Sequence, residues 1–250
     1  MRTFIIIAII FSFTKVLYSQ VPAEEPKTLL YKKEFSIGAV IHSSGWGVFY
    51  RNGRHLTGTL KRSWDIEFVS LSSPKESSIS SQYNENAKQY VYGRLNLFFI
   101  LRTGIGTQKV LYRKPQKRGV EIRYFNFIGV SNGILKPIYL EIINPSSNPN
   151  QFTLTTEKYD PLRHFPDYNI FGRAAFTEGL EKIGYIPGGY IKCGLNFEFA
   201  DYEENSKLRI LEIGAVSDAY PKNVPIMAFN ENSKFFLNVY LAFHLGMKKI

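Results

Sequence analysis

Apolar and polar residues alternate along most of the chain after residue 33. The run YIKCGLNFEF at 190–199 is apolar on every second position, with polar residues or glycine in between. The runs at 64–68, 90–102 and 138–142 have the same two-sided pattern. Because successive side chains of a β-strand point to opposite faces, a period of two indicates strands with one apolar and one polar face. The chain is therefore predicted to be all-β.

Clusters of Gly, Asn-Gly and Ser/Asn/Pro separate these runs and set the strand count. Ten strands are predicted, at 33–42, 46–52, 57–71, 89–102, 106–114, 118–131, 134–143, 188–200, 206–219 and 234–248. Eight is the alternative count, if 33–52 or 118–143 is continuous. In the second of these segments Phe125 and Phe127 share a face with charged residues, and a β-bulge there would re-phase the faces.

Strand length separates a membrane barrel from a soluble sandwich, whose strands also alternate. Several predicted strands reach the ~9–11 residues that a tilted transmembrane strand requires, about twice the average for soluble strands. Aromatic residues gather near strand ends, as in interfacial girdles. They are Trp46, Tyr50, Trp64, Tyr90, Tyr92, Tyr190, Tyr220 and Phe235. Residues 33–250 are therefore predicted to form a transmembrane antiparallel up-and-down β-barrel.

The predicted connections alternate in length. Short ones lie at 52–55, 103–105, 131–133 and 201–205, and long ones at 72–88, 144–187 and 220–233, with tight turns at 43–45 and 115–117 as exceptions. Short periplasmic turns and longer outer loops are typical of outer-membrane barrels. The long outer loop 144–187 has apolar residues at helical spacing, which predicts a short amphipathic helix at 173–183. That helix either packs on the barrel rim or forms a lid or a docking surface for a partner.

The N-terminus predicts export. Residues 1–19 combine a basic residue, an apolar run and a small residue before the expected cleavage site near Ser19, as in a secretory signal peptide. The apolar run is about half of the ~20 residues that a spanning helix requires, which disfavours the alternative of an uncleaved anchor. Residues 20–32 are expected to form a periplasmic linker. The expected location is the outer membrane.

Composition narrows the partners and the chemistry. The net charge of +10 and the pI near 9.5 would suit nucleic acid, but export favours lipid phosphates or acidic protein surfaces. We expect outer-membrane lipid, both lipopolysaccharide and phospholipid, and other envelope proteins as partners, and no nucleic acid. Cys193 is the single cysteine, so neither an intramolecular disulfide nor a cysteine zinc site is expected. No cofactor or metal is expected.

If the apolar faces meet lipid, the opposite faces place charged residues in the barrel interior. The predicted luminal charge network comprises Asp65, Glu67, Arg94, Arg102, Lys109, Arg113, Glu121, Arg123, Glu141, Lys192, Glu198 and Glu212. Opposite charges in a narrow, poorly hydrated interior must pair. Because the interior of a small barrel is just wide enough for side chains, a structural network that fills it is favoured over an ion-selective channel.

The last predicted strand has the longest apolar face. Its expected lipid-facing residues are Phe235, Leu237, Val239, Leu241, Phe243, Leu245 and Met247. A one-residue slip would replace this face with one that holds Asn238 and His244, so the pattern fixes the register. We expect this strand to close the barrel against the first strand, near Phe35, Ile37, Ala39 and Ile41.

No catalytic residue is expected. His42 and Ser43 are adjacent in a strand and point to opposite faces, which makes them a poor base and nucleophile. His164 with Asp160 and Asp167 is a weak candidate for a cation site, and local Asx turns explain the aspartates equally well. The sequence has no Walker motif, HExxH or GxSxG.

Several stretches together resemble uncharacterised small outer-membrane β-barrel families of the Bacteroidota. They are the leader ending in YSQ, HSSGWG at 42–47, SPKE at 73–76, GILKPIYLEI at 133–142 and YPKNVPIMAFN at 220–230. The resemblance implies a role as an accessory subunit of an envelope machine for secretion or barrel assembly, and implies no catalytic residue. The leading hypothesis is a non-enzymatic scaffold. The alternatives are a small-solute or ion pore, a lipid-modifying enzyme with His42 or His55 as base, and a soluble periplasmic barrel.

Overall fold

The computed structural model describes residues 32–73, 76–79, 88–113, 119–145, 152–164, 170–199 and 207–249. The predicted signal peptide, and the predicted linker apart from its last residue, lie outside these residues. Within the described ranges, no helix has the length and hydropathy that crossing a membrane would require.

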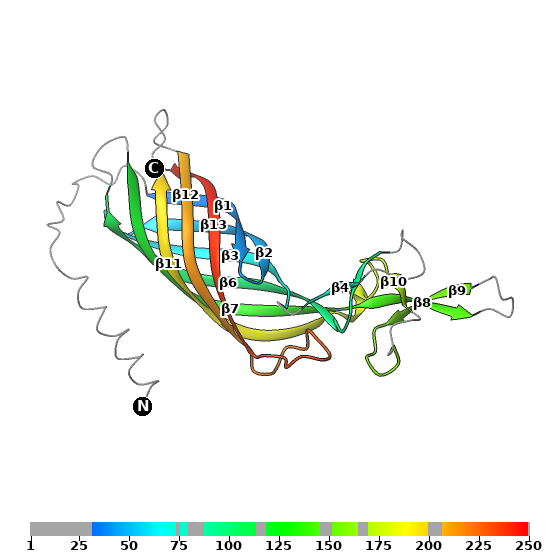
Figure 1. The fold of residues 1–250 in the computed structure, drawn as a ribbon. Coiled ribbons are helices and arrows are strands. Elements are labelled where there is room, and N and C mark those ends of the chain that lie inside the picture. Colours follow the sequence, from blue (N-terminus) through cyan, green and yellow to red (C-terminus); the bar gives the residue numbers. More distant parts are fainter. Residues whose placement is uncertain are drawn as a thin grey trace.

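Eight strands of the described part of the chain close into an antiparallel barrel (Figure 1). They are β1 (Lys33–His42), β2 (Gly45–His55), β3 (Leu60–Leu71), β6 (Asn96–Tyr112), β7 (Val120–Pro137), β11 (Gly184–Phe199), β12 (Lys207–Ala219) and β13 (Phe235–Lys249). Each strand pairs with the next barrel strand along the chain, and β13 pairs with β1. Phe35 lies opposite Met247 and Ile41 opposite Leu241, so the last strand closes the barrel in the expected register.

The barrel has the alternative count of eight strands, and the main expectation of ten is wrong. The expected turns at 103–105 and 131–133 are interior parts of β6 and β7, which pair with each other through both segments. The glycines that indicated turns there accommodate rings instead. A Cβ on Gly104 would lie 2.3 Å from the Tyr190 hydroxyl, and one on Gly133 would lie 2.8 Å from the Phe98 ring. Only glycine leaves space for such an approach.

Each connection between barrel strands can be assigned to one of the two ends of the barrel. The start of β1, the end of β13 and the connections 56–59, 113–119 and 200–206 belong to one end. The connections 43–44, 72–95, 138–183 and 220–234 belong to the other end, which we call the outer end. The expected tight turn at 115–117 lies outside the described residues. Residues 43–44 remain the one short connection at the outer end of the barrel.

A second, smaller sheet projects from the outer end (Figure 1). It comprises β8 (Tyr139–Pro145), β9 (Phe152–Lys158) and β10 (Ile170–Arg173), with β8 in the middle. In the connection before β6, β4 (Ser78–Ile79) pairs with β5 (Tyr90–Val91). These elements share a core of Tyr90, Ile138, Leu140, Ile142, Tyr159 and Ile170. The expectation of a barrel strand through residue 143 is wrong, because β7 ends at Pro137 and β8 joins the other sheet.

The predicted helix at 173–183 is also wrong. Its first residue ends β10, and the only helical turn within it is the 3-10 helix η3 (Leu180–Lys182). Gly179, just before η3, has φ of 83°, a left-handed conformation that interrupts a regular α-helix. The apolar spacing that suggested a helix therefore belongs to an irregular segment.

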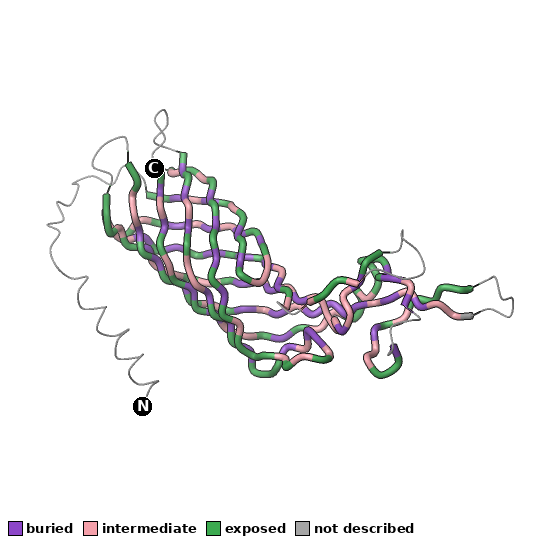
Figure 2. The backbone as a smooth tube through the Cα atoms, viewed as in Figure 1, coloured by how far each residue is buried: buried purple, intermediate pink, exposed green. Residues whose placement is uncertain are grey.

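Buried and exposed positions alternate along the barrel strands (Figure 2). All seven predicted lipid-facing residues of β13 lie on the outer face, with exposed fractions between 45% and 75%. Three expected girdle residues do not lie there, because Tyr90, Tyr190 and Tyr220 are each no more than 4% exposed. Trp46 and Trp64 do lie on the outer surface.

Candidate functional site in the barrel interior

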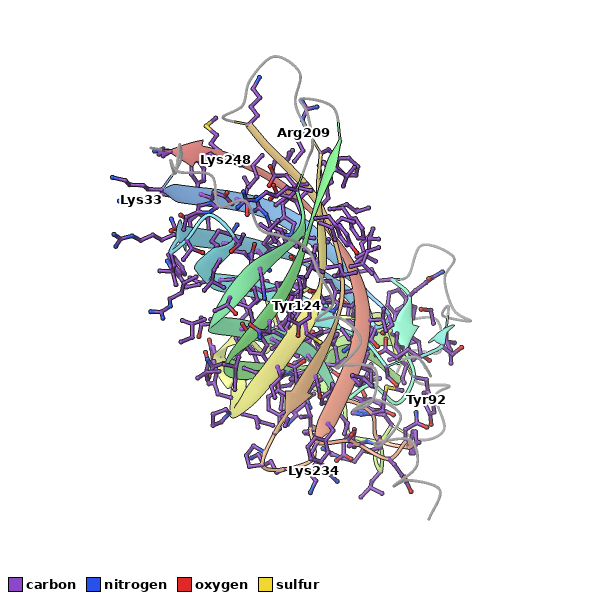
Figure 3. The ribbon with its side chains drawn as sticks, turned by 90° about the vertical axis from the view of Figure 1, so that its left-hand side faces the viewer. Lys33, Tyr92, Tyr124, Arg209, Lys234 and Lys248 are labelled. Carbon is purple, nitrogen blue, oxygen red and sulfur yellow. The ribbon has the colours of Figure 1, made fainter. Side chains whose placement is uncertain are left out.

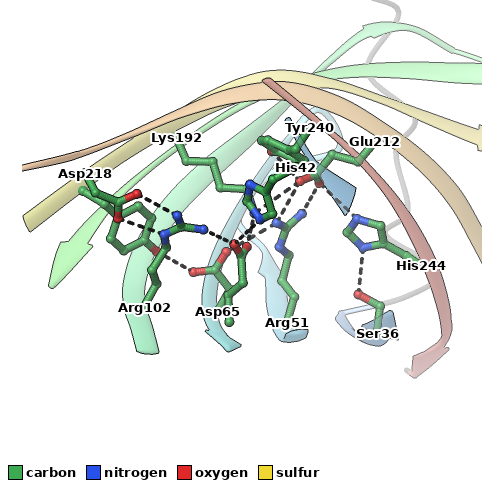
Figure 4. Close-up of polar contacts among 12 residues, drawn as sticks. Ser36, His42, Arg51, Asp65, Arg102, Lys192, Glu212, Asp218, Tyr240 and His244 are labelled. Atoms are coloured by element: carbon green, nitrogen blue, oxygen red, sulfur yellow. Dashed lines mark hydrogen bonds and ion pairs between the residues drawn. The ribbon is translucent and has the colours of Figure 1, made fainter. Parts of the chain in front are cut away.

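The inner faces of the barrel strands bring charged side chains together along the interior (Figure 4). At the centre, the Arg51 guanidinium donates to both carboxylate oxygens of Glu212, with N–O distances of 2.5 and 3.2 Å. Arg51 also lies 3.4 Å from Asp65. Each carboxylate accepts from a tyrosine hydroxyl, Glu212 from Tyr240 at 2.7 Å and Asp65 from Tyr190 at 2.8 Å. These residues come from β2, β3, β11, β12 and β13, so the cluster ties together opposite sides of the barrel.

A second arginine lies nearer the outer end. Arg102 donates Nε–H and Nη2–H to the two oxygens of Asp218, at 2.9 and 2.6 Å, and a further N–H to Glu67. This bidentate geometry is the strong form of an arginine–carboxylate pair. Lys192 Nζ lies 2.5 Å from Glu67 and 3.6 Å from Glu212, and so joins this pair to the central one.

Ser131 and Tyr220 cover the outer side of the Arg102 pair. The Ser131 hydroxyl donates to Asp218 at 2.9 Å and lies 2.7 Å from the Tyr220 hydroxyl. Tyr220 follows the end of β12, and burial raises the pKa of its hydroxyl. The Tyr220 hydroxyl therefore stays protonated and neutral, and it contacts the Ser131 hydroxyl above the Arg102–Asp218 pair.

A third group of charges lies toward the end that carries the β1 and β13 termini. Glu34 accepts from Lys61 at 2.5 Å and lies 2.7 Å from His55 Nε2. Arg123 pairs with Glu34 at 3.3 Å and with Glu198 and Glu121 at 2.5 Å each. All of these groups are charged or ionisable, and every carboxylate among them has a cationic partner, as burial of charge requires.

Aromatic rings fill the space between the ion pairs. The Arg51 guanidinium carbon lies 4.5 Å from the Phe127 ring centre and 5.6 Å from that of Phe125. Both phenylalanines therefore belong to the inner face with Arg123, and no bulge in β7 is needed to re-phase them. A cavity beside Ser36 and His244 has a volume of about 10 Å³, which is room for roughly one water molecule.

Seven of the twelve predicted network residues are buried in the barrel interior, each no more than 4% exposed. They are Asp65, Glu67, Arg102, Arg123, Lys192, Glu198 and Glu212. Glu121 lies partly buried at the margin, where it binds Arg123.

The structure places the other four outside the network, which corrects the prediction for them. Arg94 follows β5 and pairs with Glu76, and Glu141 belongs to β8 of the projecting sheet. Lys109 and Arg113 are exposed on the outside. β6 is continuous through 103–105, so Lys109 lies on the same face as the outward Ile105.

The prediction missed several interior residues that the structure shows. They are Glu34, Ser36, His42, Arg51, Lys61, Ser131, Tyr190 and Asp218. Asn238, Tyr240 and His244 are buried too, on the inner face of the last strand, where the alternation predicted them. For some of the missed residues, an even spacing from a residue on the inner face would have predicted the inward position. Asp218 lies six residues after Glu212 and Arg51 two residues after the inward Phe49, so each shares a face with an inner residue.

Three interior residues, Ser36, His244 and Glu212, have the types found in a serine hydrolase. Ser36 Oγ lies 3.3 Å from His244 Nδ1, and His244 Nε2 lies 3.1 Å from Glu212 (Figure 4). The surroundings do not suit catalysis. All three residues are at most 4% exposed, the adjacent cavity holds about one water, and the strand backbone donors around them serve the barrel ladder instead of an oxyanion hole. The triad is therefore a buried part of the interior network.

The other histidines also have structural partners. His42 Nε2 lies 3.5 Å from Glu67, while the neighbouring Ser43 hydroxyl donates to Asn238 at 2.9 Å. His164 Nδ1 accepts from the backbone N–H of Asp160 at 2.9 Å. Asp167, the third member of the candidate cation site, lies outside the described residues. Within the described ranges no three His, Cys, Asp or Glu residues are placed to hold a metal ion.

Comparisons with known proteins find similarity to outer-membrane barrels in structure and not in sequence. No known family model and no curated protein matches the sequence. Among solved structures, Ail of Yersinia pestis aligns at 7% identity over 88% of this chain and 99% of its own, with a TM-score of 0.41. Neisserial surface protein A aligns at 8% identity over 87% and 96%, with a TM-score of 0.40. The N-terminal β-barrel of Pseudomonas aeruginosa OprF aligns at 8% identity over 87% and 97%, with a TM-score of 0.34. These values are too low to assign a family or a function.

Proposed function

We propose that the protein is a non-enzymatic outer-membrane barrel that acts as a scaffold or accessory subunit of an envelope complex. The observation that carries the proposal is that the barrel interior and the projecting sheet have different compositions. The barrel interior is filled by buried, mutually paired charges, whereas a separate sheet with its own core projects from the outer end. A filled barrel serves as an anchor, and the projecting sheet is the part that is free to meet another protein.

The outer face of the barrel supports a membrane location. Its exposed side chains include Ile41, Trp46, Ile105, Ile128 and Leu237, from five different strands, each more than 60% exposed. Soluble monomers rarely expose contiguous apolar patches larger than a few hundred Å². A closed barrel satisfies its own backbone hydrogen bonds, so lipid can cover this face. The soluble periplasmic alternative leaves it uncovered.

The edge strand β9 supports a scaffold role. Among the described residues it pairs only with β8, so its other backbone edge is available to a partner strand. Six of its seven residues are exposed, among them Phe152 and Leu154 at 56% and 44%. Addition of a strand to such an edge is a common mode of protein recognition. We assign the partner contact to this edge.

Crosslinking in cells tests the proposal. A photoreactive residue in place of Thr153 or Thr155 is expected to join the chain to another envelope protein, and the same residue in place of Thr57, at the opposite barrel end, is expected not to. Thr156→Pro removes a backbone donor from the free edge of β9, because the N–H groups of Thr155 and Glu157 face β8, and is expected to abolish the adduct without affecting the barrel. Recovery of the chain as a lone monomer at native expression, with no adduct from β9, would contradict the proposal.

A further inference from the structure

Basic residues end the outer apolar face on six adjacent barrel strands. The six exposed residues are Arg209 on β12, Lys249 on β13, Lys33 on β1, Arg54 on β2, Arg62 on β3 and Lys109 on β6. Each lies toward the end of the barrel that carries the β1 and β13 termini. Lys33, Lys248 and Arg209 lie together at this end, far from Lys234 (Figure 3).

Four of these bases form a continuous row. Lys249 lies directly opposite Lys33 in the strand register, Lys33 opposite Arg54, and Arg54 opposite Arg62. Like charges directly opposite one another on the same face of a sheet destabilise it. An anionic partner bound at this row of four bases would relieve their mutual repulsion.

The protein does not supply that partner within its described residues. The nearby carboxylates of Glu34 and Glu198 point into the barrel, where they bind Lys61 and Lys248. Lys249 Nζ lies 5.4 Å from the Phe35 ring centre, a cation–π contact that leaves its charge in place. None of the four bases in the row makes an ion pair with a described residue, so no described residue compensates their charge.

An apolar groove begins at Arg62. It has a volume of about 560 Å³ on the outer face and is lined by Arg62, Thr107, Asn126 and three isoleucines. The isoleucines form one row across three strands, because Ile105 lies opposite Ile128 and Ile128 opposite Ile191. Thr107 donates to Asn126 at 2.7 Å, so the polar lining at the charged margin is partly satisfied within the protein. On this surface, the cationic row thus adjoins the apolar groove.

We propose that this face binds an anionic phospholipid, with its phosphate on the row of Lys33, Arg54 and Arg62 and an acyl chain in the isoleucine groove. The proposal rests on the membrane location given above. Short connections and both barrel termini mark the periplasmic end of an outer-membrane barrel, and the lipid at that face is phospholipid. A net negative head group matches four bases that no described residue neutralises better than a zwitterionic one does.

Lipid retention by the purified full-length protein tests the site. The protein in detergent is titrated with phosphatidylglycerol or with phosphatidylcholine, and bound lipid is counted by native mass spectrometry. The wild type is expected to retain phosphatidylglycerol preferentially. R54Q with R62Q is expected to weaken that binding by about fivefold for each base removed. The control K222Q with K234Q makes the same change of charge at the outer end, and is expected to have no effect.

A second variant tests the groove without a change of charge. Thr107→Trp fills the space beside Arg62 and is expected to reduce phosphatidylglycerol retention while the barrel still shifts on a gel when heated. Equal retention of the two lipids by the wild type, or equal losses in the R54Q/R62Q pair and its control, would overturn the lipid site alone. Release of the wild type by osmotic shock would overturn both the lipid site and the membrane location on which it rests.

Discussion

At the scale of single residues, Glu212 shows why the barrel interior is filled. It accepts from Arg51 and Tyr240, lies 3.1 Å from His244 and 3.6 Å from Lys192, and is fully buried. If the carboxylate were replaced by a neutral group, Arg51 and Lys192 would each lose a negatively charged partner. Removal of one partner from a buried ion pair typically costs about 3–5 kcal/mol.

Glu212→Gln is therefore expected to lower the free energy of unfolding by about 3–5 kcal/mol. Gln has nearly the same shape, so the loss reports the charge and not a cavity. Urea titration of the reconstituted protein measures it. The control is Glu157→Gln, whose 40% exposed carboxylate lies 3.6 Å from His164 at the surface, and it is expected to cost at most about 1 kcal/mol. Equal stability of the two variants would argue against the ion pairs as the interior support.

A substitution of Ser36 can distinguish a structural role of the interior residues from a catalytic one. Ser36→Ala removes the hydroxyl beside His244 and is expected to leave the composition of envelope lipids unchanged. Mass spectrometry of lipids from cells that carry the variant, the wild type or a deletion provides the measurement. A lipid change shared by Ser36→Ala and the deletion would instead indicate that the Ser36, His244 and Glu212 set has an activity.

At the scale of elements, β13 and β9 are exposed for different reasons. β13 pairs on both sides and exposes only alternate residues, whereas β9 pairs on one side and exposes consecutive ones. Alternate exposure suits a strand whose outer face meets lipid, and consecutive exposure suits a sheet edge that meets water or a protein. The two strands should therefore respond differently to the same substitution.

Leu241→Arg is expected to destabilise the barrel in a bilayer by about 2–4 kcal/mol, because it places a charge at the middle of the lipid-facing series. Leu154→Arg on β9 makes the same change at a position of similar exposure, 44% against 45%, and is expected to have little effect. Unfolding from phosphatidylcholine vesicles measures both. A similar cost at the two positions would contradict the lipid contact of β13.

At the scale of the whole molecule, the protein has two cores with different compositions. The barrel core combines apolar residues such as Phe98 and Ile100 with the buried ion pairs, whereas the outer core of β8, β10 and their neighbours is made of apolar and aromatic residues. A barrel of eight strands has an interior that side chains alone can fill. We therefore expect no continuous aqueous path through the barrel.

Planar-bilayer recordings of the reconstituted wild type are therefore expected to show no discrete conductance steps. The same preparation must show heat-dependent migration on a gel, which confirms that folded barrels are present. Reproducible conductance steps from a preparation that passes this folding test would favour the pore hypothesis over the scaffold hypothesis.

Sequence alternation correctly predicted the antiparallel barrel, the outward series of β13 and its closure against β1. These features depend on a period of two, which every strand with one apolar face must have. The strand count and the position of Lys109 could not be predicted, because a glycine in a strand and a glycine in a turn look the same in one sequence. Gly104 leaves space for Tyr190, a residue 86 positions away that only the folded barrel brings near.

The sequence by itself determined which residues of each strand share a face, because side-chain direction alternates along an extended backbone. Only the tertiary structure decided which charges meet. The partners Arg51 and Glu212 are 161 residues apart, and Arg102 and Asp218 are 116 apart. Their contact depends on barrel closure, strand register and the width of the interior, which arise when all eight strands pair. The branching of the chain into a second sheet after Pro137 was likewise decided by packing, since Leu140 and Ile142 alternate as a barrel strand would but bury their side chains in another core.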